Sequence, residues 1–191
     1  MICRRSLFAL LPLFGVAAVF GGSQLAAAEP ELLTVKIAVH PRGLNRNGKP
    51  GVRYINLSRE QSHFHVVVTN KSQQPQRLWE TWNSWGYFNL RFEVADEKGK
   101  VLYTIEKSLR EWSKNFASWV ELAPGEQFVM DVDFARERWD LPFLKTKRRG
   151  DFTLRMRAVF ENKTDGDTKE HKVWTGKIAS PFEDYQVHYW R

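Results

Sequence analysis

Apolar residues recur at every second position over most of the chain, and this period constrains the fold more than any other feature of the sequence. The clearest case is the segment 88–94, in which apolar and polar residues alternate throughout. Successive side chains of a β-strand point to opposite faces of a sheet, so this period predicts half-buried strands. Further segments with this period or with β-prone composition are 33–39, 54–57, 64–69, 78–82, 101–105, 119–122, 128–134, 152–160, 172–178 and 185–189.

Turn signals separate these segments. Residues 96–99 (Asp-Glu-Lys-Gly) lie between two of them and predict an antiparallel hairpin of 88–94 with 101–105. Only 106–116 departs from the pattern, because apolar residues there are spaced by three and four, which suits a short helix or an irregular crossover. The sequence therefore predicts an all-β fold, an antiparallel two-sheet immunoglobulin-like sandwich of about eight strands with at most one short helix.

The N-terminus has the organisation of an export signal. Arg4 and Arg5 precede the apolar stretch 7–20, and small residues lead to three alanines at 26–28. We expect residues 1–28 to be a cleavable signal peptide and 29–191 to be a single β-sandwich domain, periplasmic or secreted. Retention as a membrane anchor is the alternative, but a spanning helix needs about 20 apolar residues and this stretch is shorter. No membrane span is expected in the mature chain.

Composition restricts the chemistry of this domain. The only cysteine, Cys3, lies in the predicted signal peptide, so neither a disulfide framework nor thiolate chemistry is expected after cleavage. The formal net charge of +7 is spread along the chain, and its densest run is 145–149. Such a run can bind polyanions, but it is also typical of a solvated loop, so no nucleic-acid partner is expected.

The segment 78–88 is unusually rich in aromatic residues. Trp79 and Trp82 are separated by an odd number of positions, as are Trp82 and Trp85, so one strand cannot bury all three on the same face. At least one ring is therefore expected to be exposed or to lie where the chain turns, at Asn83 and Ser84. Exposed rings stack on sugars or anchor protein partners. In the alternative interpretation, Trp82 packs in the core while Trp79 and Trp85 cover its edge.

Other candidate sites are less complete. His63 and His65 point to one face of a strand, as two ligands of a copper or zinc site do, but no carboxylate or sulfur at a supporting spacing completes the set. Residues 149–151 (Arg-Gly-Asp) are interpreted as the start of the following strand rather than as an integrin motif. No catalytic motif is present, so neither an enzyme nor a cofactor is predicted.

Four turn motifs also carry a resemblance. They are Asn70-Lys71-Ser72, the hairpin turn 96–99, Leu122-Ala123-Pro124-Gly125-Glu126 and Gly150-Asp151-Phe152-Thr153-Leu154. Over residues 63–160 the chain resembles the immunoglobulin-like sandwiches of bacterial secreted proteins, and it is similar in particular to proteinase-inhibitor domains of the BsuPI type. The resemblance implies a two-sheet fold and an inhibitor-like binding role.

The leading hypothesis is an exported, non-catalytic binding module that acts through protein–protein contact. Its expected contact residues are Trp79, Trp85, Tyr87, Lys71 and Arg77. A polysaccharide is the alternative partner, in which case the same tryptophans form a stacking platform. The third hypothesis is a metal-binding accessory domain that uses His63 and His65.

Overall fold

The computed structural model describes residues 32–39, 53–57, 63–113, 115–134, 137–145 and 149–189. The predicted signal peptide and its cleavage point lie outside these residues, as does 146–148 of the basic run. Most of the described chain is β-strand, which confirms the all-β prediction. The strands are β1 (Leu33–Ala38), β2 (Tyr54–Asn56), β3 (Phe64–Asn70), β4 (Gln76–Trp79), β5 (Leu90–Ala95), β6 (Val101–Lys107), β7 (Trp119–Leu122), β8 (Gln127–Val132), β9 (Trp139–Asp140), β10 (Gly150–Asn162), β11 (Gly176–Ala179) and β12 (Glu183–Tyr189).

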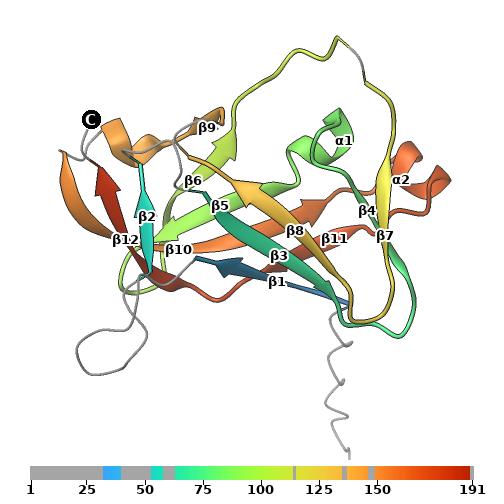
Figure 1. Ribbon diagram of the computed structural model, residues 1–191, viewed down its shortest axis with the longest axis horizontal. Coiled ribbons are helices and arrows are strands. Elements are labelled where there is room, and N and C mark those ends of the chain that lie inside the picture. The colour runs from blue at the N-terminus through green and yellow to red at the C-terminus, as the bar shows by residue number, and fades with distance from the viewer. Residues whose placement is uncertain are drawn as a thin grey trace, which may run out of the picture.

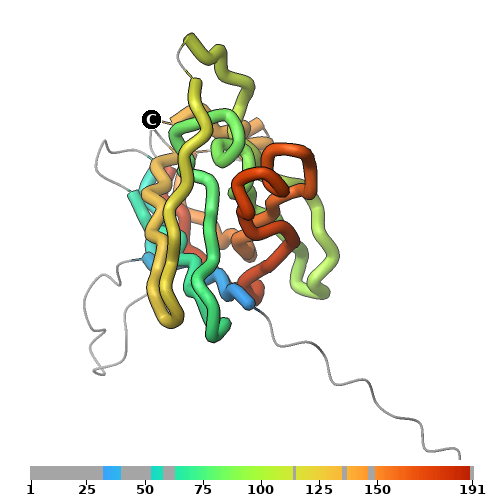
Figure 2. The backbone as a smooth tube through the Cα atoms, turned by 90° about the vertical axis from the view of Figure 1, so that its right-hand side faces the viewer, coloured from blue at the N-terminus to red at the C-terminus, as the bar shows by residue number. Residues whose placement is uncertain are grey.

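In the described part of the chain the strands form three sheets (Figure 1). The largest has the order β2-β12-β10-β5-β6-β9, with β11 also paired to β10, and it curls like half of a barrel. A smaller sheet, β1-β3-β8, lies against it, with β1 in contact with β10 and β11. The third is the β4–β7 ribbon, whose two strands run side by side in Figure 2. All pairings of these strands are antiparallel except β2 with β12.

The core fills the space between the small sheet and the curled sheet. Alternation produces it directly: Leu33, Val35 and Ile37 of β1 are buried, whereas Lys36 between them is exposed. Phe92 of β5 is fully buried in the same core. The predicted hairpin is also present, because β5 pairs antiparallel with β6 across the turn 96–99.

Two short α-helices correct the prediction of at most one. Helix α1 (Ser84–Tyr87) is capped at its N-terminus by Asn83, whose side chain accepts a hydrogen bond from the backbone N–H of Gly86. This cap ends the predicted strand 78–82 early, at Trp79. Helix α2 (Gly166–Glu170) lies between β10 and β11, and Asp165 and Thr168 form a reciprocal capping box at its start. The backbone N–H of Thr168 holds the pKa of Asp165 below its usual value.

Three further segments complete the fold. Within 106–116, β6 continues to Lys107 and the described residues after it form no helix, so this segment is the irregular crossover, one of its two predicted alternatives. The segment 137–145 buries Trp139 and Phe143 through β9 and a 3₁₀ turn at Pro142–Lys145. β12 lies inside the curled sheet, because β10 pairs with one side of it and β2 with the other. Among the described residues, no helix has the length and apolar character needed to cross a membrane.

A buried asparagine links two of the turns. The Asn70 side chain accepts from the backbone N–H of Ser72 at 2.9 Å and donates to the carbonyl of Leu122 at 2.9 Å. Its backbone carbonyl accepts from Gly125, and its backbone N–H donates to the carbonyl of Glu126. The Asn70 turn and the turn before β8 are therefore one hydrogen-bonded unit.

Replacing this asparagine has a defined expected cost. Asn70→Ala leaves the buried carbonyl of Leu122 without its side-chain donor, so we expect the free energy of unfolding to fall by about 2–3 kcal/mol. Urea denaturation measures this loss, and the exposed Gln74→Ala in the same turn is the control, with an expected change within about 0.5 kcal/mol. Equal stability of the two variants would contradict the linking role of Asn70.

Candidate functional site

An aromatic cluster joins the β4–β7 ribbon to both short helices. The ring centroid of Trp79 lies 5.9 Å from that of Trp85 on α1 and 6.2 Å from that of Trp119 on β7. His171, which follows α2, packs 5.5 Å from Trp79 and 4.9 Å from Trp119. The indole N–H of Trp85 donates to Asp167 of α2 at 2.6 Å. This cluster therefore holds α1 and α2 in fixed positions on the ribbon.

The tryptophans of segment 78–88 are distributed as their spacing requires, but not as either interpretation assigned them. Trp79 is 1% exposed and Trp82 is 43% exposed. Trp82 is thus the exposed ring, and the alternative that placed it in the core is wrong. The reason is the turn at Asn83, whose amide also donates to the carbonyl of Ser118 and so directs the chain into α1 after Trp82.

The five residues expected to contact a partner do not form one surface. Trp79 and Tyr87 are buried, so neither ring is part of the exposed surface. Trp85 is half-buried beside Trp79. Arg77 pairs with Glu121 across the ribbon at 2.8 Å, and its guanidinium lies 5.4 Å from the Trp119 ring centre. Lys71 is exposed in the β3–β4 turn, at the end of β4 away from α1.

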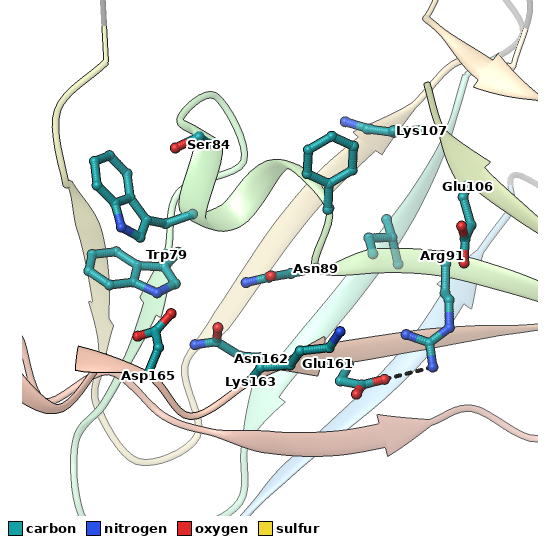
Figure 3. Close-up of a pocket in the computed structure, with 13 residues that line it drawn as sticks. Trp79, Ser84, Asn89, Arg91, Glu106, Lys107, Glu161, Asn162, Lys163 and Asp165 are labelled. Atoms are coloured by element: carbon teal, nitrogen blue, oxygen red, sulfur yellow. Dashed lines mark ion pairs between the residues drawn. The ribbon is translucent and has the colours of Figure 1, made fainter. Parts of the chain in front are cut away.

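One hollow beside the cluster, here called the tryptophan cleft, has a volume of about 430 Å³. Trp79 and Asp165 lie at one end of it and Glu106 at the other (Figure 3). Its lining residues are Trp79, Ser84, Trp85, Phe88, Asn89, Leu90, Arg91, Glu106, Lys107, Glu161, Asn162, Lys163 and Asp165.

Most polar groups of this cleft are already engaged. Arg91 pairs with Glu161 at 2.7 Å and holds the pKa of that carboxyl below its usual value. The side-chain amide of Asn89, in the orientation that satisfies both of its groups, donates to the carbonyls of Trp85 and Glu161. Asn162 donates to a backbone carbonyl at 2.7 Å. The cleft is thus a rigid cavity with aromatic and amide walls.

A second and larger hollow, the loop groove, lies on the other side of α1 and has a volume of about 1160 Å³. Residues 108–113 and 115–118, which lie between β6 and β7, arch above α1 in Figure 1, and residues 109–111 of this loop line the groove. Its lining residues are Thr81, Trp82, Tyr87, Lys107, Leu109, Arg110, Glu111, Glu137 and Arg138. Lys107 lines both hollows and so marks where they meet.

Apolar side chains are unusually exposed around the loop groove. Trp82 and Phe116 pack edge to face, with ring centroids 4.9 Å apart, yet they are 43% and 63% exposed. Leu109, which lines the groove, is 86% exposed. We call these three residues and the neighbouring cations Arg110 and Arg138 the aromatic loop surface.

The sequence had pointed to residues of this surface, but other residues were expected to contact a partner. The spacing of Leu109, Trp112 and Phe116 suggested a short helix or an irregular crossover, and the structure leaves Leu109 and Phe116 exposed on a crossover. The feature of the sequence that predicted this surface is the odd spacing of Trp82 from Trp79 and Trp85, which requires at least one exposed ring. Trp82 and Phe116 are 34 positions apart in the sequence, and they come into contact because the chain returns past α1 before it enters β7.

Lys107 is the most buried cation between the two hollows. Its side chain is 10% exposed, and its ammonium lies 4.7 Å from the ring centre of Tyr87 and 5.3 Å from that of Trp139. Burial lowers the pKa of Lys107, and the charge of Arg110 lowers it further, while Glu137 at 3.7 Å opposes the shift. The ammonium therefore lies between two aromatic rings and forms one long ion pair, with Glu137.

The described residues do not assemble the metal site of the third hypothesis. His65 is held by Asp131 at 2.7 Å, and His63 packs beside it with ring centroids 5.6 Å apart. No group of three or more metal-binding side chains gathers within the described ranges. Gly150 and Asp151, the last two residues of the Arg-Gly-Asp triplet, open β10 as interpreted.

Comparisons with known protein families, with curated protein sequences and with solved structures found no match to this chain. The resemblance to BsuPI-type inhibitor domains therefore stays a prediction, and the site must be judged from its own geometry.

Proposed function

We propose that this chain is an exported, non-catalytic binding domain that acts through protein–protein contact at its aromatic loop surface. The observation that carries the proposal is the exposed pair of Trp82 and Phe116, with Leu109 beside it at the mouth of a groove. Folded domains rarely leave several large apolar side chains together in water, and such patches mark interaction sites. Tryptophan and arginine are also the residues most often found at the centres of protein interfaces.

The geometry of the surface favours a protein over a polysaccharide. The planes of Trp82 and Phe116 are inclined by 67°, so they do not form the flat row on which successive sugars stack. Charged residues surround them instead: Glu80 accepts from the Trp82 indole N–H, and Arg110 and Glu111 line the groove. Apolar anchors within a charged rim are typical of protein interfaces.

The fold is proposed to be an immunoglobulin-like sandwich with an inhibitor-like role. Two features support it: the sheet β1-β3-β8 lies against the curled sheet, and the Asn70 turn is hydrogen-bonded to the turn 123–126. Both turns belong to the BsuPI-type resemblance. The export signal read in residues 1–28 supports a periplasmic or secreted location.

A saccharide ligand is the second candidate, and the tryptophan cleft favours it. Trp85 is half-buried beside buried Trp79, with ring planes inclined by 36°, and the side chains of Asn89 and Asn162 line the same cavity. Aromatic walls with a few fixed polar groups are typical of small-ligand sites.

Affinity capture from extracytoplasmic extract and on insoluble polysaccharides tests both candidates. Immobilised wild-type protein is compared with Trp82→Ala/Phe116→Ala, and the control is Leu102→Ala/Val129→Ala, which removes exposed apolar side chains elsewhere. We expect the wild type and the control to capture the same protein. The variant Trp82→Ala/Phe116→Ala should capture at least about tenfold less of it, although its thermal unfolding is unchanged.

Equal capture by all three forms would contradict the proposal. Retention on a polysaccharide that Trp85→Ala abolishes would instead establish the second candidate.

A further inference from the structure

We propose that the loop groove recognises a carboxylate side chain carried next to an apolar residue in an acidic peptide segment of the partner. This inference rests on the proposed function, because it names the chemistry of the partner that the aromatic loop surface binds. It is carried by the charges that line the groove and by the way these charges are held.

Three cations converge on the groove from separate segments. Lys107 comes from the end of β6, Arg110 from the loop after it, and Arg138 from the segment before β9. A hydrogen bond of 2.7 Å from the backbone N–H of Ser108 to the carbonyl of Arg138 fixes these segments side by side. Two acids, Glu111 and Glu137, also line the groove, so its positive charges outnumber its negative charges by three to two.

Two of the three cations, Lys107 and Arg110, lie against aromatic rings. The guanidinium of Arg110 lies 4.9 Å from the ring centre of Trp112 and 6.0 Å from that of Tyr87. In the part of the chain that the structure describes, neither Arg110 nor Arg138 has a carboxylate within ion-pair distance. Stacking on a ring uses the face of a guanidinium, whereas a carboxylate binds the N–H groups at its edge. These donors are therefore available to a ligand.

Lys107 adds a buried donor at the same place. Its ammonium forms an ion pair with Glu137 at 3.7 Å, a distance longer than that of a direct hydrogen bond. Glu137 is itself engaged, because its carboxylate accepts from the Trp139 indole N–H at 2.6 Å. Because an ammonium has three donors and Glu137 is shared with the Trp139 indole, Lys107 can still donate to an anionic ligand in the groove.

The walls of the groove define what must accompany the carboxylate. Trp82 and Leu109 line it and are largely exposed, and Phe116 packs on Trp82. An aromatic or aliphatic side chain next to the acid would cover these residues while the carboxylate reaches the cations. A lone small anion would leave them in water, so an acidic and apolar peptide fits the whole groove best.

Fluorescence anisotropy with three labelled octapeptides tests this assignment. All three are acetylated and amidated, and phenylalanine alternates with glutamate, glutamine or lysine. We expect the glutamate peptide to bind at least about tenfold more tightly than the glutamine peptide, the lysine peptide to bind most weakly, and the preference to shrink as salt is added.

Two variants separate local recognition from overall charge. Arg110→Gln/Arg138→Gln should abolish the preference for glutamate. Lys98→Gln/Lys100→Gln, which removes the same charge from the exposed β5–β6 turn, should leave it intact. Thermal unfolding of both variants checks that each remains folded.

Each other outcome overturns the inference in a recognisable way. Equal affinity for the glutamate and glutamine peptides, with loss of both in Trp82→Ala/Phe116→Ala, would overturn acid recognition but leave the proposed function standing. If no peptide binds, the proposed recognition of an acidic peptide is wrong. Binding of oligogalacturonate in place of the glutamate peptide would overturn it too. If capture of the partner does not depend on Trp82 and Phe116, the proposed function itself is wrong.

Discussion

Phe92→Ala is expected to lower the free energy of unfolding by about 3–5 kcal/mol, as large-to-small changes of buried aromatic residues do. Phe92 is fully buried in the middle of β5. Its ring packs against Phe64 of β3 at 5.6 Å, Phe134 at 5.3 Å and Trp139 at 5.4 Å. Removing it leaves a cavity where the small sheet, the curled sheet and the segment 137–145 meet.

Urea denaturation at neutral pH measures this loss. Phe88→Ala is the matched control, because Phe88 lies just before the same strand and is 44% exposed. Its cost should stay below about 1 kcal/mol. A loss below about 1 kcal/mol for Phe92→Ala would show that this face of β5 is not the core.

Trp79→Ala should be comparably damaging, with an expected cost of about 3–5 kcal/mol. Trp79 is 1% exposed, and its ring touches Trp85, Trp119 and His171. Each of these neighbours belongs to a different segment, so the substitution should release α1 and the residues after α2 from the ribbon. Hydrogen exchange should therefore accelerate in α1 and α2 before it does in β5 and β10.

Trp82→Ala provides the contrast, because it removes the same side chain three positions away. Trp82 is exposed, so its loss should change the free energy of unfolding by no more than about 0.5 kcal/mol while weakening partner capture. The opposite ranking of Trp79 and Trp82 in stability would show that the positions of these rings are reversed.

The stability predictions and the binding proposal thus concern different residues of one segment. Trp79 is a structural residue that fixes the short helices, and Trp82 is a surface residue at the groove. Both were visible in the sequence as members of a dense aromatic run, but only Trp79 had been expected to contact a partner. Its burial moves the proposed contact to Trp82 and to the loop that contains Leu109 and Phe116.

Much of the strand content follows from local rules. The alternation in β1, β5 and β10 reflects the pleat, which sends successive side chains to opposite faces, and one buried face then selects apolar residues. The hairpin between β5 and β6 follows from its turn, where Asp96 accepts from the backbone N–H of Lys98 and Gly99 adopts a positive φ. These features depend on neighbours within a few positions, so a single sequence suffices to predict them.

Local rules fail where a distant contact competes with them. Residues 78–82 have strand character, but the strand stops at Trp79 because Asn83 caps α1 and donates to the carbonyl of Ser118. The spacing in 106–116 suits a helix, yet Leu109 is 86% and Phe116 63% exposed, so these two side chains are not part of a buried face that would stabilise one. Short helices depend on tertiary packing for most of their stability, so spacing alone could not decide either case.

The sequence by itself determined that the chain is built from β-strands and that the turn 96–99 closes a hairpin. It also determined that the tryptophans of 78–88 cannot all be buried on one face of a strand. Tertiary structure alone decided that Trp79 is the buried ring and Trp82 the exposed one. It also decided that Lys107, Arg110 and Arg138 line one groove. The physical reason is range: pleat and turn geometry act between adjacent residues, whereas a groove and a core form only when segments far apart in the chain come together.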